Sequence, residues 1–303
     1  MVIGRRGDPA RGSGPLGGEG RWALLFLAPT LIGLAVLSAG PIVATLAISL
    51  TEWDLLRAPQ LVGLDNFVHL ASDERFGKAL RNTAFYTVVS VPLGMLISLF
   101  LAVALNQTIR GIAWIRTAYF LPVVTSTIAV ALVWQWIYSP DAGLLNQFIG
   151  LFGIAPQKWL SNPTLAMPSI VAISVWQGLG TNIIIFLAGL QAIPGELLDA
   201  ASVDGAGRWA RFRNVVLPLL TPSIFFTGVL SLIGSFQVFD QVFVLSRPRP
   251  TDATITVVYF IYENGFKFFR MGYATAASWV LFVIVAFFTT IYFRSQKRWV
   301  HYQ

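Results

Sequence analysis

The decisive stretch of this sequence is Ile193-Pro194-Gly195-Glu196-Leu197-Leu198-Asp199-Ala200-Ala201-Ser202-Val203-Asp204-Gly205-Ala206. It is a short polar island between two long apolar runs, at about 168–190 and 217–244. Acids alternate with small residues in it, and Arg208, Arg211 and Arg213 follow within one more helical length. We therefore predict a structured loop at a membrane surface, built to dock into a partner.

The composition is that of an integral membrane protein. Of 303 residues, 55% are hydrophobic and only 12% are charged, whereas a soluble protein carries about 25% charged residues. A charged side chain inside a bilayer is costly, which explains the low share. The chain has no Cys and only two His. Disulfides, thiolate metal sites and cysteine nucleophiles are excluded, and no metal site is expected.

Six apolar segments are long enough to span a membrane, since a spanning helix needs about 20 largely apolar residues. They lie at about 22–50, 82–105, 113–137, 168–190, 217–244 and 273–293. The predicted fold class is an all-α integral membrane protein with six transmembrane helices. Residues 1–20 are rich in Gly, Pro and Arg and are expected to be a disordered cytoplasmic tail. One membrane domain follows over 21–303, with its cytoplasmic loop at 194–218.

The basic residues predict the orientation. With the N-terminus inside, twelve of the 21 Lys and Arg residues lie on the cytoplasmic side, and the other nine are spread over longer outer loops. Cytoplasmic loops retain Lys and Arg, so both termini and the 194–218 loop are predicted to be cytoplasmic. The same retention explains the net charge of +7, and no nucleic-acid partner is expected.

Two glycine motifs fail as nucleotide sites. Residues 12–17 match GxGxxG and residues 205–210 match its GxGxxA variant, but neither lies in the βαβ unit that the motif requires. Gly77-Lys78 is followed by Ala79, so no Walker A loop is present. The chain is therefore not expected to hydrolyse ATP or to hold a cofactor.

The sequence of this polar island also predicts its local structure. Residues 196–203 can form two helical turns with acids early, where the helix dipole favours them. Asp204-Gly205 signals a turn, and residues 207–216 can form a second short helix before Pro218. Alanines at the surface of such a pair would let a partner approach closely.

The run from Ile193 to Ala206, with the later Phe212, Leu217-Pro218 and Pro222, resembles the EAA loop of binding-protein-dependent ABC importer permeases. The likeness is closest to the carbohydrate-type permeases of the maltose and glycerol-3-phosphate class. In that family the loop forms the coupling helix, which inserts into a cleft on the ATPase subunit. One departure is Asp199, which stands where the family has its leading Glu. The resemblance implies ATPase coupling for Glu196, Asp199, Ala200, Ala201, Asp204, Gly205, Ala206, Arg208, Phe212, Leu217 and Pro218.

The resemblance also implies a type I ABC importer in the plasma (inner) membrane of a bacterium or archaeon. This chain would pair with a second permease, expected to be a different chain. Two ATPase subunits, which carry ATP and Mg, would dock at the coupling loops, and an extracytoplasmic solute-binding protein would deliver a sugar or sugar-like solute. Transport would follow alternating access, and the chain itself would not be an enzyme.

A sugar pathway needs hydrogen-bonding side chains and aromatic faces. Polar residues in the fourth and fifth spans are the predicted pathway: Trp176, Gln177, Asn182, Ser235, Gln237 and Asp240. Asp240 is the one ionisable group expected inside a span, and such a group is a functional hypothesis by default. Hydration close to the outer surface is the competing explanation. Trp134-Gln135-Trp136 is assigned to the interfacial aromatic belt.

Two other classes stay open at this point. A membrane-embedded transferase needs clustered acids or His at one membrane face, and the sequence offers no such cluster. An ion-coupled secondary transporter usually has more spans, internal repeats or intramembrane charges. Asp240 alone gives that alternative little support.

Overall fold

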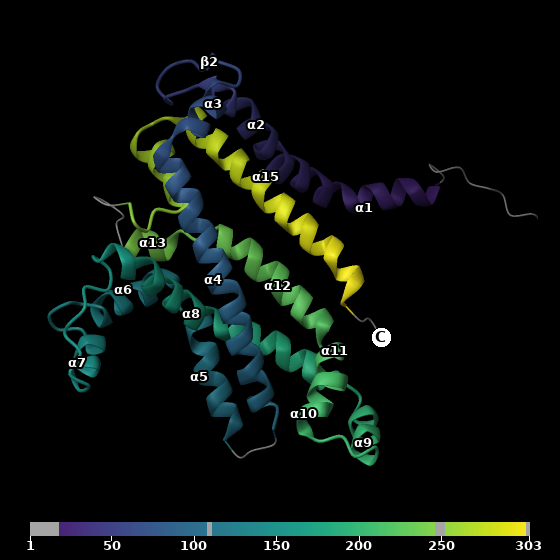
Figure 1. Ribbon diagram of the computed structural model, residues 1–303. Helices are drawn as coiled ribbons and strands as arrows, with labels where there is room; N and C mark the ends of the chain where they lie inside the picture. Colours follow the sequence, from purple (N-terminus) through teal and green to yellow (C-terminus); the bar gives the residue numbers. More distant parts are fainter. Residues whose placement is uncertain (1–17, 108–110, 246–251, 301–303) are drawn as a thin grey trace, which may run out of the picture.

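The computed structural model describes residues 18–107, 111–245 and 252–300, which are almost entirely helical (Figure 1). Long helices run between two ends of the molecule, called here the α3 end and the α9 end after the short helices that lie there. Most of the tail expected at 1–20 lies outside the described residues. Residues 18–20 begin α1 (Gly18–Leu34).

The first span reaches away from the helical body. It consists of α1, a π-helical turn η1 (Ala35–Ala39) and α2 (Gly40–Ser49). The turn ends two residues before Pro41, which has no N–H to donate to a regular helix. α2 lies along α15 (Met271–Ser295), whereas α1 projects from the body (Figure 1). No residue in the most apolar window of this span is buried.

The centre of the bundle is formed by α4 (Glu74–Leu105), α8 (Pro163–Gln191) and α12 (Thr221–Phe236). Both long helices begin at a capping side chain. The Asp73 carboxylate accepts from the backbone N–H groups of residues 75 and 76, and Asn162 accepts from that of residue 164. Ile170, Ile173 and Phe186 of α8 are fully buried and form the middle of the core.

The third predicted span is not one straight helix. The segment 113–137 is divided into α5 (Ile112–Val124) and α6 (Thr127–Ile137), which meet at 103°. Thr125 and Ser126 between them have extended backbone. The described residues therefore contain five helices that can each span a membrane, and a sixth span only if this bent pair counts as one.

The loops expected to be partly folded carry short elements. At the α3 end, β1 (Thr51–Glu52) pairs antiparallel with β2 (Gln60–Leu61), and α3 (Asp65–Ser72) follows. The Asn66 amide donates to the carbonyl oxygens of Ser49 and Thr51, both at 2.9 Å, and so fixes this cap on the end of α2. The remaining loop elements are α7 (Leu144–Gly150), α13 (Asp240–Leu245), α14 (Val257–Tyr262) and the π-helical turn η3 (Glu263–Lys267).

A partly buried ionic network joins α4 to the segment before α15. Arg75 contacts both oxygens of Asp252 at 2.9 and 3.0 Å and one oxygen of Glu263, while Lys267 lies 3.3 Å from the other Glu263 oxygen. Only 2% of the Glu263 side chain is exposed. Asn82, two turns along α4, donates to the carbonyl oxygens of residues 252 and 255. This network holds α14 and η3 against the α3 end of α4.

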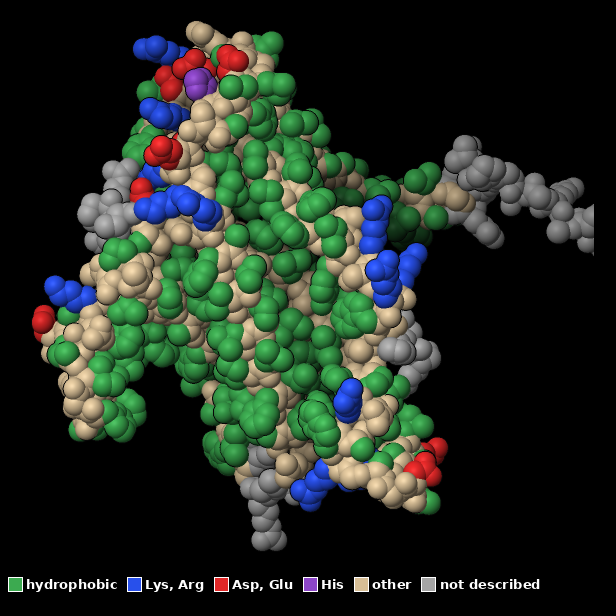
Figure 2. All heavy atoms as spheres, in the orientation of Figure 1, with side chains coloured by type: hydrophobic (Ala, Val, Ile, Leu, Met, Phe, Trp, Pro, Cys, Tyr) green, Lys and Arg blue, Asp and Glu red, His purple; other side chains and the backbone are tan. Residues whose placement is uncertain are grey.

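The α9 end holds the predicted cytoplasmic loop. Its elements are α9 (Gly195–Val203), α10 (Arg208–Arg211), the π-helical turn η2 (Phe212–Val216) and α11 (Leu217–Leu219), and the chain's last described turn is η4 (Gln296–Arg298). Figure 2 shows hydrophobic side chains covering the middle of the visible face. Charged side chains lie around the edges of this face, at its two ends and on its flanks, as expected of a protein whose middle lies in lipid.

Candidate functional site

The polar island folds into a capped helix and a tight turn. The Gly205 N–H donates to the Ser202 carbonyl at 3.1 Å, and the Ala206 N–H donates to the Ala201 carbonyl at 2.9 Å. This pair of bonds is a Schellman motif, which needs a left-handed residue at its C′ position. Gly205 takes that position with φ of 78°. The turn predicted at Asp204-Gly205 is thus the C-terminal cap of α9.

α9 is presented to solvent rather than packed into the protein, because none of its residues is buried. Among the predicted coupling residues, those of α9 and its cap lie at this surface: Glu196, Asp199, Ala200, Asp204 and Gly205 are exposed, and Ala201 and Ala206 are half-buried. Arg208, on α10, is exposed as well. Phe212, Leu217 and Pro218 are half-buried and lie where the loop enters the membrane helices.

Two contacts fix the second half of the loop. The Arg211 guanidinium donates to the Ser202 hydroxyl at 2.8 Å, which joins α10 to α9. Trp209 stacks on Phe212 with ring centroids 5.7 Å apart. The second short helix predicted at 207–216 begins at Arg208 and continues through η2 into α11, so the loop leads directly into the helices of the fifth span. α9 is thus connected to α12 by a short, largely helical segment.

A polar cavity of about 260 Å³ lies between α4, α8 and α12. Asn182 of α8 and Ser235 of α12 line it, as do Tyr86 and Ser90 of α4. Hydroxyl and amide groups dominate its polar side chains, and none of its lining residues is charged.

A smaller cavity of about 200 Å³ adjoins the first one, since Tyr86 and Gly234 line both. Gln237, Asp240 and Gln241 also line it. Asp240 is the first residue of α13 and is exposed, so its carboxylate faces the cavity and not the core. This arrangement places one negative charge among neutral hydrogen-bonding groups.

The structure brings four of the six predicted pathway residues to these two cavities: Asn182, Ser235, Gln237 and Asp240. Gln177 lies beside them in a hydrogen-bonded row, donating to the Thr127 hydroxyl at 3.2 Å and accepting from Gln241 at 3.3 Å. Trp176 lines neither cavity. Its ring meets Trp134 edge-on at 5.5 Å.

Four further polar residues line the two cavities and were not among the predicted pathway residues. They lie on α4, α6 and the first half of α8: Tyr86, Ser90, Thr127 and Ser174. A signal for some of them was present. Residues 86, 90 and 94 recur every four positions, which places them on one face of a helix. Isolated hydroxyl residues in an apolar span are common, however, and small polar residues often serve only helix packing.

Comparison with known proteins decides the family. Residues 78–300 match the family described as "Binding-protein-dependent transport system inner membrane component". The chain belongs to this family. It is therefore a membrane permease subunit, and the resemblance seen in the polar island is confirmed.

Individual relatives can be aligned with most of the permease's length. It is 40% identical over 284 residues to the probable ABC transporter permease YesP of Bacillus subtilis, covering 92% of this chain and 91% of the relative. Identity is 30% over 283 residues to the probable starch degradation products transport permease AmyD of Thermoanaerobacterium thermosulfurigenes, covering 92% and 96%. UgpA of Yersinia pestis, an sn-glycerol-3-phosphate transport permease, is 34% identical over 245 residues, covering 80% and 83%.

Solved structures agree on the fold. The permease superposes with a TM-score of 0.81 on a chain of a bacterial ABC transporter that imports the acidic polysaccharide alginate. The two sequences are 25% identical, and the match covers 92% of this chain and 96% of the other. The six-span, all-α architecture predicted from hydropathy is thus confirmed as an ABC importer permease fold. Neither alternative class, the transferase or the secondary transporter, receives support from these matches.

Proposed function

We propose that this permease carries a sugar or sugar-like solute into the cell, driven by ATP hydrolysis on partner subunits. The observation that carries the proposal is the set of hydroxyl and amide side chains that line the two adjoining cavities, with Asp240 as the one charged group among them. A sugar is uncharged and rich in hydroxyl groups, so its passage needs donors and acceptors without a strong field. Asn182, Ser235, Gln237 and their neighbours supply such groups. The relative AmyD, which is named for the transport of starch degradation products, supports the same substrate class.

The coupling step is assigned to α9 and its turn. A cleft on an ATPase subunit would receive the exposed helix, with Glu196 and Asp199 facing the partner's cationic or polar groups. ATP and Mg would be held by that subunit. Closing of the ATPase pair would move α9, and the path through α10, η2 and α11 would carry the movement to α12 and the cavities. Alternating access to the two sides of the membrane would follow.

The assembly needs three further kinds of chain. A second permease, a different chain, would cover the exposed apolar surface of α1 and complete the pathway. Two ATPase subunits would bind at the α9 end. The distribution of Lys and Arg predicts that this end and both termini lie on the cytoplasmic side. A solute-binding protein would dock outside, at the α3 end. The protein would thus work in the inner membrane of a bacterium or archaeon.

The test is uptake by the complete importer in sealed vesicles. Labelled neutral trisaccharides would be supplied with the solute-binding protein outside and ATP inside. Asn182→Leu removes an amide from the cavity, and Ala172→Leu is its control, because it places the same side chain on the exposed face of the same helix.

We expect the parent importer to take up the sugar only with ATP. Asn182→Leu should lower this uptake by about tenfold or more, because a sugar hydroxyl then loses its hydrogen-bond partner. Ala172→Leu should leave uptake unchanged. Uptake that is independent of ATP would contradict the energy source. Equal effects of the two variants would contradict the pathway.

A further inference from the structure

An apolar groove lies at the α9 end, between α4 and the segment formed by α10 and η2. Its volume is about 470 Å³, within the range of pockets that hold small molecules. Phe100 and Val103 of α4 line one side, and Trp209 and Phe212 line the other. Arg208 is the one charged side chain among the lining residues. No residue of α9 lines this α4–α10 groove, so it is separate from the surface proposed to meet the ATPase.

We propose that the α4–α10 groove binds an anionic phospholipid of the membrane leaflet at the α9 end. In this arrangement one acyl chain lies along α4, and the phosphate group contacts Arg208. The proposal goes beyond the proposed transport of a sugar, because it does not depend on which solute is carried. It gives the coupling loop a contact with the membrane beside its contact with the ATPase.

The α4 side of the groove is an apolar face that the rest of the described chain leaves uncovered. Leu96, Phe100 and Val103 are all exposed, Phe100 by 73%. Their spacing of four and three residues places them on one face of the helix. The opposite face is packed, since Ser98 and Ala102 are fully buried. From residue 96 to residue 103 the helix rises by roughly 10 Å, and an acyl chain can pack along this length by van der Waals contact.

The α10 side of the groove has the composition of a segment that lies at a membrane surface. Trp209 is 71% exposed and stacks on Phe212 with ring centroids 5.7 Å apart. Arg208 and Arg211 belong to the same four-residue helix as Trp209. Segments at the membrane interface place Trp and Phe at the edge of the acyl region and keep their basic groups at the lipid head groups. The groove therefore lies at the depth where the phosphate of a lipid joins its acyl chains.

The arginines beside the groove are not neutralised by the described residues. The side chains of Arg208 and Arg213 make no hydrogen bond or ion pair with any of these residues. Arg211 donates to the Ser202 hydroxyl, which is uncharged. Residues 205–239 contain no Asp or Glu. A basic residue near the surface attracts anionic lipid, and a guanidinium group matches the geometry of a phosphate. An anionic lipid therefore complements the groove better than a zwitterionic one.

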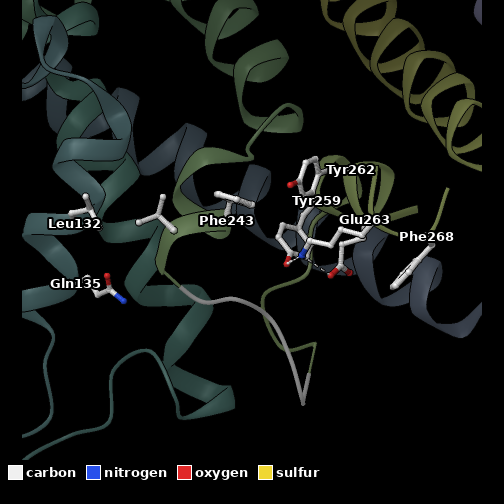
Figure 3. A pocket seen from close by; sticks show the side chains of 9 residues that line it. Leu132, Gln135, Phe243, Tyr259, Tyr262, Glu263 and Phe268 are labelled. Carbon is white, nitrogen blue, oxygen red and sulfur yellow. Dashed lines mark hydrogen bonds and ion pairs between the residues drawn. The ribbon is translucent and has the colours of Figure 1, made fainter. Parts of the chain in front are cut away.

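A hollow nearer the α3 end, between α6, α13, α14 and η3, has a different character (Figure 3). Its basic side chain, Lys267, lies 3.3 Å from a carboxylate oxygen of Glu263. Its aromatic rings pack on one another, with the centroids of Phe243 and Tyr262 5.5 Å apart. The charge of Lys267 is thus already opposed by a neighbouring carboxylate, whereas no described residue opposes that of Arg208. This contrast favours the α4–α10 groove as the place for an anionic ligand.

The experiment places the complete importer in phosphatidylcholine bilayers that contain a small share of a photoactivatable lipid. Two probes carry the same diazirine acyl chain, one on anionic phosphatidylglycerol and the other on zwitterionic phosphatidylcholine. After illumination, mass spectrometry of the digested permease measures the label on residues 96–103 and 208–212. Arg208→Gln removes the charge in the groove. Arg213→Gln is the matched control, because it removes the same charge from the same loop at a residue that does not line the groove.

We expect the phosphatidylglycerol probe to label the groove about 3- to 10-fold more than the phosphatidylcholine probe. Arg208→Gln should abolish this preference, and Arg213→Gln should retain most of it. Equal labelling by the two probes would overturn the proposal, because it indicates ordinary surrounding lipid. Equal loss of the preference in the two variants would also overturn it, since the basic loop would then attract anionic lipid without a defined site.

Two further outcomes would assign the groove to a protein partner and so overturn the proposal. The first is absence of label from both probes in the groove while the exposed Phe287 of α15 is labelled, because a neighbouring chain then covers the groove. The second is loss of the ATPase subunits from the Arg208→Gln complex, which would place Arg208 in the ATPase contact. These readouts do not involve transport, so they stand or fall separately from the proposed function.

Discussion

Gly205 is the residue whose backbone decides the shape of the coupling loop. Its φ of 78° is rarely adopted by residues with a Cβ, and a β-branched side chain there is a genuine outlier. We expect Gly205→Val to open the cap of α9 and reduce ATP-dependent uptake below about a tenth of the parent value, with normal membrane insertion. Gly207→Val is the control, because Gly207 has ordinary extended backbone and open space around it. Similar uptake by both variants, at equal expression, would count against a coupling role.

Glu263 is the residue whose ionisation holds the α3 end together. Burial opposes its charge, but the hydrogen bonds and charges of Arg75 and Lys267 outweigh burial and lower the pKa of this carboxyl. A lowered folded-state pKa stabilises the protein above the unfolded value of about 4.3, and this stabilisation is lost as pH falls through the folded-state pKa. We expect Glu263→Gln to cost about 2 kcal/mol at pH 7. Thermal unfolding in detergent should show that the difference in stability between parent and variant shrinks as the pH falls below 4. A difference between parent and variant that does not shrink as the pH is lowered below 4 would contradict this role.

At the scale of elements, hydropathy predicted where the spans lie but not the bend within the third span. The stretches at 22–50, 82–105, 168–190 and 273–293 each correspond to a long apolar helix. The break of 103° within 113–137 was not predicted, because hydropathy measures composition and not backbone geometry. Pro122 lies within α5 and lacks a backbone N–H, which favours a bend, yet the break lies three residues beyond it, at Thr125 and Ser126. The ionic network was also missed, since Arg75, Asp252 and Glu263 are far apart in sequence and only the fold brings them together.

Close packing of α8 on α5 depends on a single glycine. A Cβ at Gly180 would come too close to the Tyr119 carbonyl oxygen and the Val123 side chain of α5. We expect Gly180→Ala to push α5 away and cost about 1–3 kcal/mol, as overpacking does. Gly178→Ala, on the same helix with nothing within 4 Å, should be close to neutral. Thermal stability in detergent measures both, and equal stability of the two variants would contradict the close approach.

At the scale of the whole molecule, the rest of the described chain leaves the most apolar part of the first span uncovered. Phe26 of α1 is 76% exposed, and the helix leaves the body that would otherwise cover it (Figure 1). The chain has no native Cys, so a single cysteine can carry a photo-crosslinker. We expect Phe26→Cys, so labelled, to crosslink to the second permease in the assembled importer. Phe287→Cys on α15, 59% exposed, is the matched position on another helix. Crosslinks from Phe26 to lipid alone would contradict the pairing.

The most direct test of the central claim is purification of the tagged permease from its native membranes, with identification of the chains that accompany it. An ATPase subunit and a second permease should purify with it, and the ATPase should be lost when Glu196 and Asp199 are both replaced by Arg, with the second permease retained. A permease that purifies alone, and still moves solute across vesicle membranes without ATP, would contradict the account.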